Sequence, residues 1–181
     1  LAMACGAVLP ANGDADRYRL VWTGDPTSTM TVGWEQASGT PVAVEYGTDP
    51  TLVAHDTNNS VTTRNYDNTA TVEGPDFDSH FVTLTGLTPD TAYHFRVVDS
   101  EGANDIYWFK TAPDSPSDFT FIAGGDSRTN NDPREWGMQL VAKIRPLFIF
   151  YGGDYMDDGS NDEWREWLDE WQYTISSDNR M

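Results

Sequence analysis

Hydrophobic and polar residues alternate from residue 18 onward, in short segments separated by turn residues. Alternation of this kind is the pattern of β-strands that have one buried and one solvated face. It is clearest in three segments, at residues 18–22, 30–34 and 42–46. Several short strands with frequent turns are typical of an all-β sandwich, which we expect over residues 16–111 without a helix.

The alternation weakens in the polar stretch from residue 49 to residue 78, where only Val61 and the segment 69–72 have an extended pattern. It returns in residues 81–97, and a last strand is predicted at residues 106–111. The sandwich is therefore predicted with one uncertain stretch in its middle.

The pattern changes after residue 117, where the apolar residues form two continuous runs at 119–123 and 147–151. Continuous apolar runs of this length predict strands that are buried on both faces of a parallel sheet. Residues 112–117, with two prolines and two serines, are typical of a short stiff linker. We therefore divide the chain into an N-terminal extension (1–15), the sandwich, this linker and an α/β segment (118–181).

A helix is predicted between the two apolar runs. Asp132 is a suitable N-cap, Pro133 suits the first helical position, and Glu135 stands three residues after the cap. Pro146 ends the helix. The apolar residues that follow the cap on one helical face are Trp136, Leu140, Val141 and Ile144. Together with its flanking runs, this helix predicts a βαβ unit.

A second capping box, at residues 160–163, predicts another helix. Its apolar residues recur at helical spacing and are Trp164, Trp167, Leu168 and Trp171. A stripe of this kind indicates a face that packs on a core, and a tryptophan surface for a sugar or a partner is the alternative.

Each apolar run of the βαβ unit ends in Gly-Gly-Asp, at residues 124–126 and 152–154. A right-handed crossover brings the carboxyl ends of both strands to the same edge of the sheet, where open α/β folds bind ligands. Asp126 and Asp154 are therefore expected to converge. With no Lys or His close by in the sequence, the two carboxylates would repel unless a cation or a shared proton lies between them, and a cation is the simpler answer.

Residues 81–97 contain a strand, a Leu-x-Pro corner and a second strand that begins at Tyr93. This arrangement resembles a fibronectin type III domain. The resemblance implies that the Tyr93 hydroxyl bonds back to upstream backbone at the corner, and that Trp34 is the core tryptophan of an early strand.

The order strand-Gly-Asp, helix, strand-Gly-Asp resembles calcineurin-like metallophosphoesterases, and the preceding fibronectin-like domain narrows the resemblance to purple acid phosphatases and their bacterial relatives. It implies a hydrolase of phosphate monoesters, with diesters and nucleotides left open. It further implies that Asp126 binds one of two metal ions (Fe, Mn or Zn) and that Asp154 bridges both. Two cations clamp a phosphate ester and lower the pKa of the attacking water.

Two residues depart from the family pattern. Many metallophosphoesterases have histidine in the first motif where this chain has Arg128, and purple acid phosphatases have tyrosine where this chain has Asp157. Arg128 either binds the substrate phosphate or pairs with nearby acids. Asp157 is either a substitute oxygen ligand or part of a solvated acidic loop.

The family's remaining ligands, in a Gly-Asn-His motif and two later histidine motifs, are not among these 181 residues. We therefore expect a longer parent protein, or else an assembly or fragment partner that covers an exposed sheet edge. The alternative function is that of a structural or adhesive surface protein with a degenerate, inactive second domain.

The charge of the chain is strongly acidic, with 29 Asp and Glu against 11 Lys and Arg, for a net charge of -18. This excess repels nucleic acids and anionic membranes, so neither is an expected docking partner. It serves either solvation or the binding of hard cations such as calcium, which leaves a calcium-dependent assembly module open. His55, His80 and His94 are far apart in the predicted sandwich and are interpreted as structural or solvated.

Cys5 is the only cysteine, which excludes a disulfide framework within the chain and a thiolate metal site. The preceding Ala2-Met3-Ala4 has the form of an export cleavage site, in which case Cys5 would begin the mature chain, either unmodified or lipidated; the alternative is that the sequence simply starts at an arbitrary point. No apolar run reaches the roughly 18 residues that a membrane-spanning helix needs. We expect a secreted, periplasmic or cell-surface protein.

Overall fold

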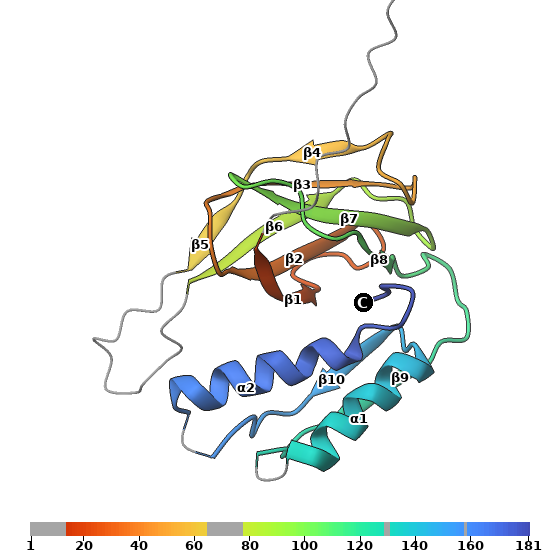
Figure 1. Cartoon of the computed structure of the whole chain (residues 1–181). Helices are drawn as coiled ribbons and strands as arrows, with labels where there is room; N and C mark the ends of the chain where they lie inside the picture. The colour runs from red at the N-terminus through yellow and green to blue at the C-terminus, as the bar shows by residue number, and fades with distance from the viewer. Residues whose placement is uncertain (1–13, 65–77, 129–130, 158) are drawn as a thin grey trace, which may run out of the picture.

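The computed structural model describes residues 14–64, 78–128, 131–157 and 159–181. Figure 1 shows two regions in this chain: a β-sandwich built by its first part, and an α/β region of two helices and a small sheet beside it. The predicted segment 69–72 and Cys5 lie outside the described residues.

The first sheet of the sandwich has the strand order β1-β2-β6-β5, and its neighbouring strands are antiparallel. The strands are β1 (Ala15–Val21), β2 (Thr29–Gln36), β6 (Ser79–Thr85) and β5 (Thr62–Arg64). β5 begins directly after Val61, the residue that the sequence pattern marked as extended and that lies just outside the strand. A register shift in β1 between Asp16 and Arg19 interrupts its pairing with β2.

The second sheet has the order β4-β3-β7-β8, again with antiparallel neighbours. Its strands are β3 (Pro41–Gly47), β7 (Ala92–Asp99), β8 (Tyr107–Lys110) and the short β4 (Asp56–Asn58). The predicted all-β sandwich is confirmed. β4 was not predicted, because its three polar residues form an edge strand and show no alternation.

The core of the sandwich lies between the two sheets. Trp34 and Phe95 are completely buried at 0% exposure. Tyr93 closes the corner before β7, since its hydroxyl accepts a hydrogen bond from the backbone N–H of Thr88 at 3.0 Å. The roles expected for Trp34 and Tyr93 are therefore confirmed.

The α/β region begins with the predicted βαβ unit. β9 (Phe121–Gly124) and β10 (Phe148–Tyr151) are parallel neighbours, and α1 (Asn131–Ile144) connects them. The helix begins one residue before Asp132, so Asp132 lies in the first turn and is not the N-cap as predicted. It ends at Ile144 because Arg145 adopts a left-handed φ of 54° before Pro146.

The faces of this unit differ from the prediction of strands buried on both sides. Phe121 and Phe150 remain 53% and 65% exposed. On α1, the predicted apolar face of Trp136, Leu140 and Ile144 is also exposed. The physical reason is that two strands and one crossover helix provide too few layers to cover these faces. The expectation that a two-stranded unit leaves helix faces unburied is confirmed.

The second helix, α2 (Asn161–Trp171), continues into a short 3-10 turn, η1 (Gln172–Thr174). Ser160 is its N-cap and accepts a hydrogen bond from the backbone N–H of Glu163 at 3.4 Å. Trp167 and Leu168 are each 6% exposed and, with Met138 of α1, form a second small core. The predicted core-facing stripe of α2 is therefore confirmed.

Specific hydrogen bonds join the α/β region to one edge strand of each sheet of the sandwich. The Gln172 side chain bonds both backbone groups of Tyr18 in β1, accepting from the N–H at 3.0 Å and donating to the carbonyl at 3.3 Å. In the second sheet, Trp108 of the edge strand β8 exchanges backbone bonds with Asn179 and Met181. These contacts cover edge strands that would otherwise be open to pairing. No helix in the described parts of the chain is long and apolar enough to cross a membrane.

Candidate functional site

The carboxyl ends of β9 and β10 lie side by side, and the chain leaves both through Gly-Gly-Asp. Gly153 has a φ of 96°, which favours glycine. A Cβ at Gly125 would lie 3.3 Å from the backbone of Gly152, so glycine also permits the close approach of the two turns. These glycines bring the following aspartates to one edge of the sheet.

Two backbone hydrogen bonds hold the turns together. The N–H of Asp126 donates to the carbonyl of Gly153 at 3.0 Å, and the N–H of Ser127 donates to the carbonyl of Asp154 at 3.1 Å. Asp126 and Asp154 both adopt a left-handed backbone, with φ values of 54° and 53°. Aspartate tolerates this region better than most residues, but the conformation persists only where its surroundings hold it. The two motifs thus have matching backbone geometry.

Arg128 lies among the three predicted acidic site residues. Its guanidinium is 3.4 Å from the carboxylates of both Asp126 and Asp154, and 3.9 Å from that of Asp157. The four side chains are 44–72% exposed, so each contact is a loose ion pair that contributes little to stability. Of the two roles considered for Arg128, pairing with the acids is the one that this structure displays.

The described residues do not by themselves build a complete metal site, because no three His, Cys, Asp or Glu side chains among them surround a common point. The donors that are present still have suitable chemistry, since carboxylate oxygens bind hard and borderline cations. The carboxylates of this edge are therefore candidate donors for a cation.

The three histidines do not approach this edge. His55 lies near Glu45, at 3.4 Å, and its other ring nitrogen meets the carbonyl of Leu52. His80 contacts the Thr63 hydroxyl at 3.0 Å, and burial lowers its pKa. His94 lies beside the ring of Trp108. All three belong to the sandwich, in line with the structural interpretation.

Behind the acidic edge are polar contacts that the sequence reasoning did not single out. The Tyr151 hydroxyl donates to the hydroxyl of Ser127, directly after Asp126. Arg134 and Glu170 form a buried ion pair between α1 and α2. The available signal was that Arg134 and Met138 stand four residues apart, so a cationic residue shares the buried stripe of α1.

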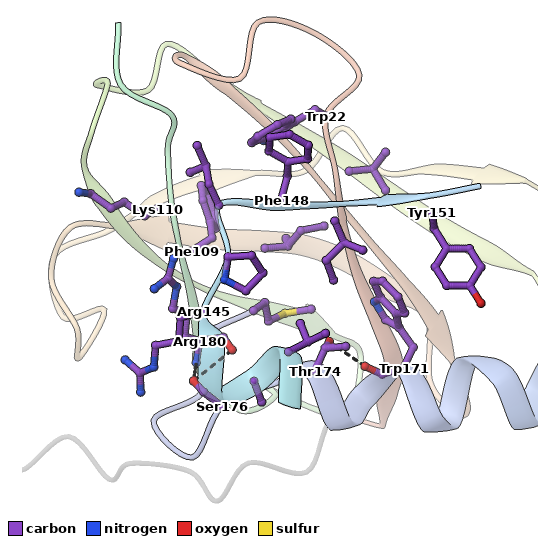
Figure 2. Close-up of a pocket in the computed structure, with 18 of the residues that line it drawn as sticks. Trp22, Phe109, Lys110, Arg145, Phe148, Tyr151, Trp171, Thr174, Ser176 and Arg180 are labelled. Atoms are coloured by element: carbon purple, nitrogen blue, oxygen red, sulfur yellow. Dashed lines mark hydrogen bonds between the residues drawn. The ribbon is translucent and has the colours of Figure 1, made fainter. Parts of the chain in front are cut away.

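An apolar cavity of about 550 Å³ lies between the sandwich and the α/β region. It is lined by residues 20–22 of the sandwich and by residues 147–151 along β10. Figure 2 shows Lys110, Arg145 and Arg180 toward one end and Tyr151 toward the other. Among the described residues that line it there is no Asp or Glu, so this cavity is chemically distinct from the acidic edge.

Comparison with known proteins places these observations in a family context. The family described as "Purple acid Phosphatase, N-terminal domain" matches residues 15–111. A purple acid phosphatase isolated from yellow lupin (Lupinus luteus) seeds has a similar structure, with a TM-score of 0.69 and 16% identity over 93% of this chain and 34% of that chain. A structure of PhoD is similar with a TM-score of 0.53 and 13% identity, over 94% of this chain and 37% of that one.

At these identities the structural likeness shows the fold alone. It covers nearly the whole chain, and therefore includes both the sandwich and the α/β region. The chain spans about a third of the length of each solved structure. No match was found among curated protein sequences.

Proposed function

The chain belongs to the family of the purple acid phosphatase N-terminal domain, and we propose that it is the front part of a metal-dependent phosphoesterase that hydrolyses phosphate monoesters. The observation that carries this proposal is the pair of matching Gly-Gly-Asp turns, which bring Asp126 and Asp154 to one edge of a parallel sheet. We retain the division into a sandwich (16–111), a linker (112–117) and the beginning of a catalytic domain (118–181).

In this proposal, Asp126 would hold one of two cations and Asp154 would be a ligand shared by both, with further donors supplied by the rest of the whole protein. Iron, manganese and zinc all accept carboxylate oxygens. When bound, two such ions supply the positive charge that neutralises a phosphate ester and acidifies the attacking water. Asp157 lies close enough to Arg128 to belong to the same charged group, which supports its inclusion as a further oxygen donor.

The proposed role of Arg128 follows from its present partners. Arg128 and a bound cation would compete for the negative charge of the same carboxylates. A cation at this edge would therefore weaken the attraction of Arg128 to Asp126 and Asp154. A guanidinium released at this edge has the planar geometry that binds phosphate oxygens through two parallel hydrogen bonds. Arg128 is therefore proposed as a substrate-binding residue that rests on the acids when neither metal nor substrate is present.

The same contacts favour one alternative function. Because Arg128 already balances part of the negative charge, this edge has less need of a cation, as expected for a non-catalytic structural or adhesive protein with a degenerate second domain. Calcium bound elsewhere on the acidic surface would suit such a protein, because the net charge is -18.

The uncovered faces of the α/β region support a proposal about partners. In the described sheet β10 pairs only with β9, so its other edge is unpaired. Successive residues of a strand point to opposite faces, and a cavity that is lined by all of residues 147–151 therefore runs along this unpaired edge. We propose that another part of the whole protein, or a second chain, covers this edge and the exposed face of α1. We also propose a secreted, periplasmic or cell-surface location.

The experiment that tests the proposed function is an aryl-phosphate assay on the whole protein, combined with metal analysis. We expect stoichiometric metal and turnover, and a loss of turnover of at least about a hundredfold in Asp154→Asn, because a neutral amide is a poor bridge between cations. Asp114→Asn, at an exposed carboxylate of the linker, is the matched control and keeps full turnover. A metal-free, inactive whole protein would establish the non-catalytic alternative.

A further inference from the structure

A buried ion pair lies beneath the acidic edge. Arg134, in the first turns of α1, contacts the carboxylate of Glu170 near the end of α2 through its Nε. The two residues are only 8% and 9% exposed, in contrast to the exposed contacts of Arg128. Among the ion pairs of the described residues, this one has both of its partners buried. Burial of two charged groups between α1 and α2 is costly and therefore needs a physical explanation.

The guanidinium of Arg134 also has partners outside that pair. One terminal nitrogen donates to the carbonyl of Ser127 at 3.2 Å, and the other donates to the side-chain oxygen of Asn131 at 3.1 Å. Its three acceptors thus come from the loop after β9, from the start of α1 and from α2. Hydrogen bonding to Glu170 is the main cause that raises the pKa of Arg134, so the guanidinium stays charged.

Stability alone does not account for this arrangement. Burying two charges has a large desolvation cost, and apolar residues of similar size often stabilise a fold as well or better. What apolar residues cannot supply is a planar fork of donors that fixes three acceptors relative to one another. The main effect of the arrangement is therefore to fix the positions of these three acceptors, and its contribution to the free energy of folding is secondary.

Ser127 connects Arg134 to the candidate site. Its carbonyl is held by Arg134, and its N–H bonds to the carbonyl of Asp154. The preceding residue is Asp126, whose left-handed backbone needs such support. From these contacts we propose that Arg134, anchored by Glu170, is a positioning residue that holds the Asp126 turn against the Asp154 turn.

This inference rests on the proposed function in one respect: only that function makes Asp126 and Asp154 metal ligands. The structural part of the proposal is independent of that function. Without the guanidinium of Arg134, the two backbone hydrogen bonds donated by Asp126 and Ser127 should open more often. Opening of this kind is measured by amide hydrogen exchange, which reports local as well as global unfolding.

The test compares amide exchange in the 181-residue chain and in the double variant Arg134→Met/Glu170→Leu, followed by NMR. We expect the melting temperature to stay within a few degrees, while the amides of Asp126 and Ser127 exchange about tenfold faster. Amides of the sandwich keep their rates. A uniform rise at all amides would indicate a purely structural role and overturn the proposal, as would rates for these two amides within about twofold of the parent.

A second variant covers the case in which the double variant does not fold. Arg134→Lys keeps a cation beside Glu170 but lacks the planar fork, so the same two amides should exchange faster, and unchanged rates would overturn the proposal. The matched control is Arg96→Met/Glu45→Leu, which removes an Arg–Glu pair on the sandwich, and it should leave Asp126 and Ser127 unaffected.

These measurements need neither metal nor substrate, so their outcome is separate from that of the phosphatase assay. If the Arg134 variants exchange faster but the whole protein proves metal-free and inactive, the proposed function is contradicted and the positioning role is left intact. If the Arg134 variants exchange at the parent rate and the whole protein is active, only the positioning role is contradicted.

Discussion

The two regions of this molecule use the same kinds of side chain in opposite ways. In the sandwich, Trp34 is fully buried between two four-stranded sheets, whereas Trp136 on α1 is 66% exposed. The same contrast holds for carboxylates, since Asp99 of the sandwich is 4% exposed and Asp126 of the α/β region has a side chain that is 72% exposed. The sandwich closes a core of its own, while the α/β region leaves both apolar faces and acidic groups available.

The contrast shows where stability and chemistry are located. Strand pairing and burial in the sandwich provide a rigid base, and Gln172 and the segment around Asn179 fasten the α/β region to its edges. The acidic turns then lie at the end of the molecule away from the sandwich core (Figure 1). Candidate functional groups placed on a well-packed support in this way are free to be exposed and weakly paired.

The largest expected effect compares the two tryptophans. Trp34→Ala removes a fully buried side chain and should lower the free energy of unfolding by about 3–5 kcal/mol. In the 181-residue chain, Trp136→Ala removes an exposed side chain and should change it by less than about 0.5 kcal/mol. Urea unfolding of both variants measures the difference. A similar loss in both would mean that the face of α1 is covered in solution.

The second effect concerns the buried carboxylate. Burial raises the pKa of Asp99, but hydrogen bonds from the Gln36 side chain, the Glu101 N–H, the Asn104 side chain and the Gly102 N–H outweigh this and hold the pKa below its usual value. Asp99→Asn should therefore cost about 2 kcal/mol at pH 7, since hydrogen bonds to a charged group are lost.

The pH dependence of this loss has a definite sign. Because the pKa of Asp99 is lower in the folded state, its stabilising effect is present above the unfolded pKa of about 3.9 and disappears as the pH falls through the folded value. The stability gap between the parent and Asp99→Asn should accordingly shrink below about pH 4. Chemical unfolding at pH 7 and pH 3 tests this. Asp126→Asn, at the exposed edge, serves as the control and should show no such gap.

A smaller effect is expected at the corner of the sandwich. Tyr93→Phe removes the hydroxyl that accepts from the backbone of Thr88, and should cost about 1 kcal/mol. Tyr173→Phe in the α/β region is the control, because Tyr173 is 45% exposed. Thermal unfolding of the two variants is the measurement. Equal melting temperatures would show that the corner bond contributes nothing.

The smallest effect is expected for Arg128. Its ion pairs are long and exposed, so Arg128→Gln should change the free energy of unfolding by less than about 0.5 kcal/mol. The measurement is urea unfolding at low and at high salt. A loss of several kcal/mol would mean that the acidic turns need Arg128 in order to fold, which the proposed release of this side chain does not allow.

The sequence predicted those parts of the fold that depend on local chemistry. Alternating residues identified the main strands, and the Leu-x-Pro corner identified the role of Tyr93. The short β4 was missed because its polar residues have no periodicity. The apolar face of α1 was identified from its spacing, but the residues that α1 buries, Arg134 and Met138, were not, since which face is covered depends on layers that a helix's own periodicity does not specify.

The candidate site shows the same division. The Gly-Gly-Asp motifs located Asp126 and Asp154 from the sequence, because the right-handed crossover rule places both strand ends at one edge. The pairing of Arg134 with Glu170 was not predictable, because 36 residues separate them and no spacing rule links two helices across a strand. For Arg128 the sequence left two roles open, and only the arrangement of the three carboxylates shows how its charge is balanced.

The central claim is that this acidic edge is one side of a two-metal site. Anomalous X-ray diffraction from crystals of the whole protein, recorded at the absorption edges of iron, manganese and zinc, tests it most directly. The account predicts two metal peaks, with the carboxylate oxygens of Asp126 and Asp154 at about 2.0–2.2 Å from them and Arg128 turned away. Peaks located elsewhere, or no peaks and Arg128 still between the carboxylates, would contradict it.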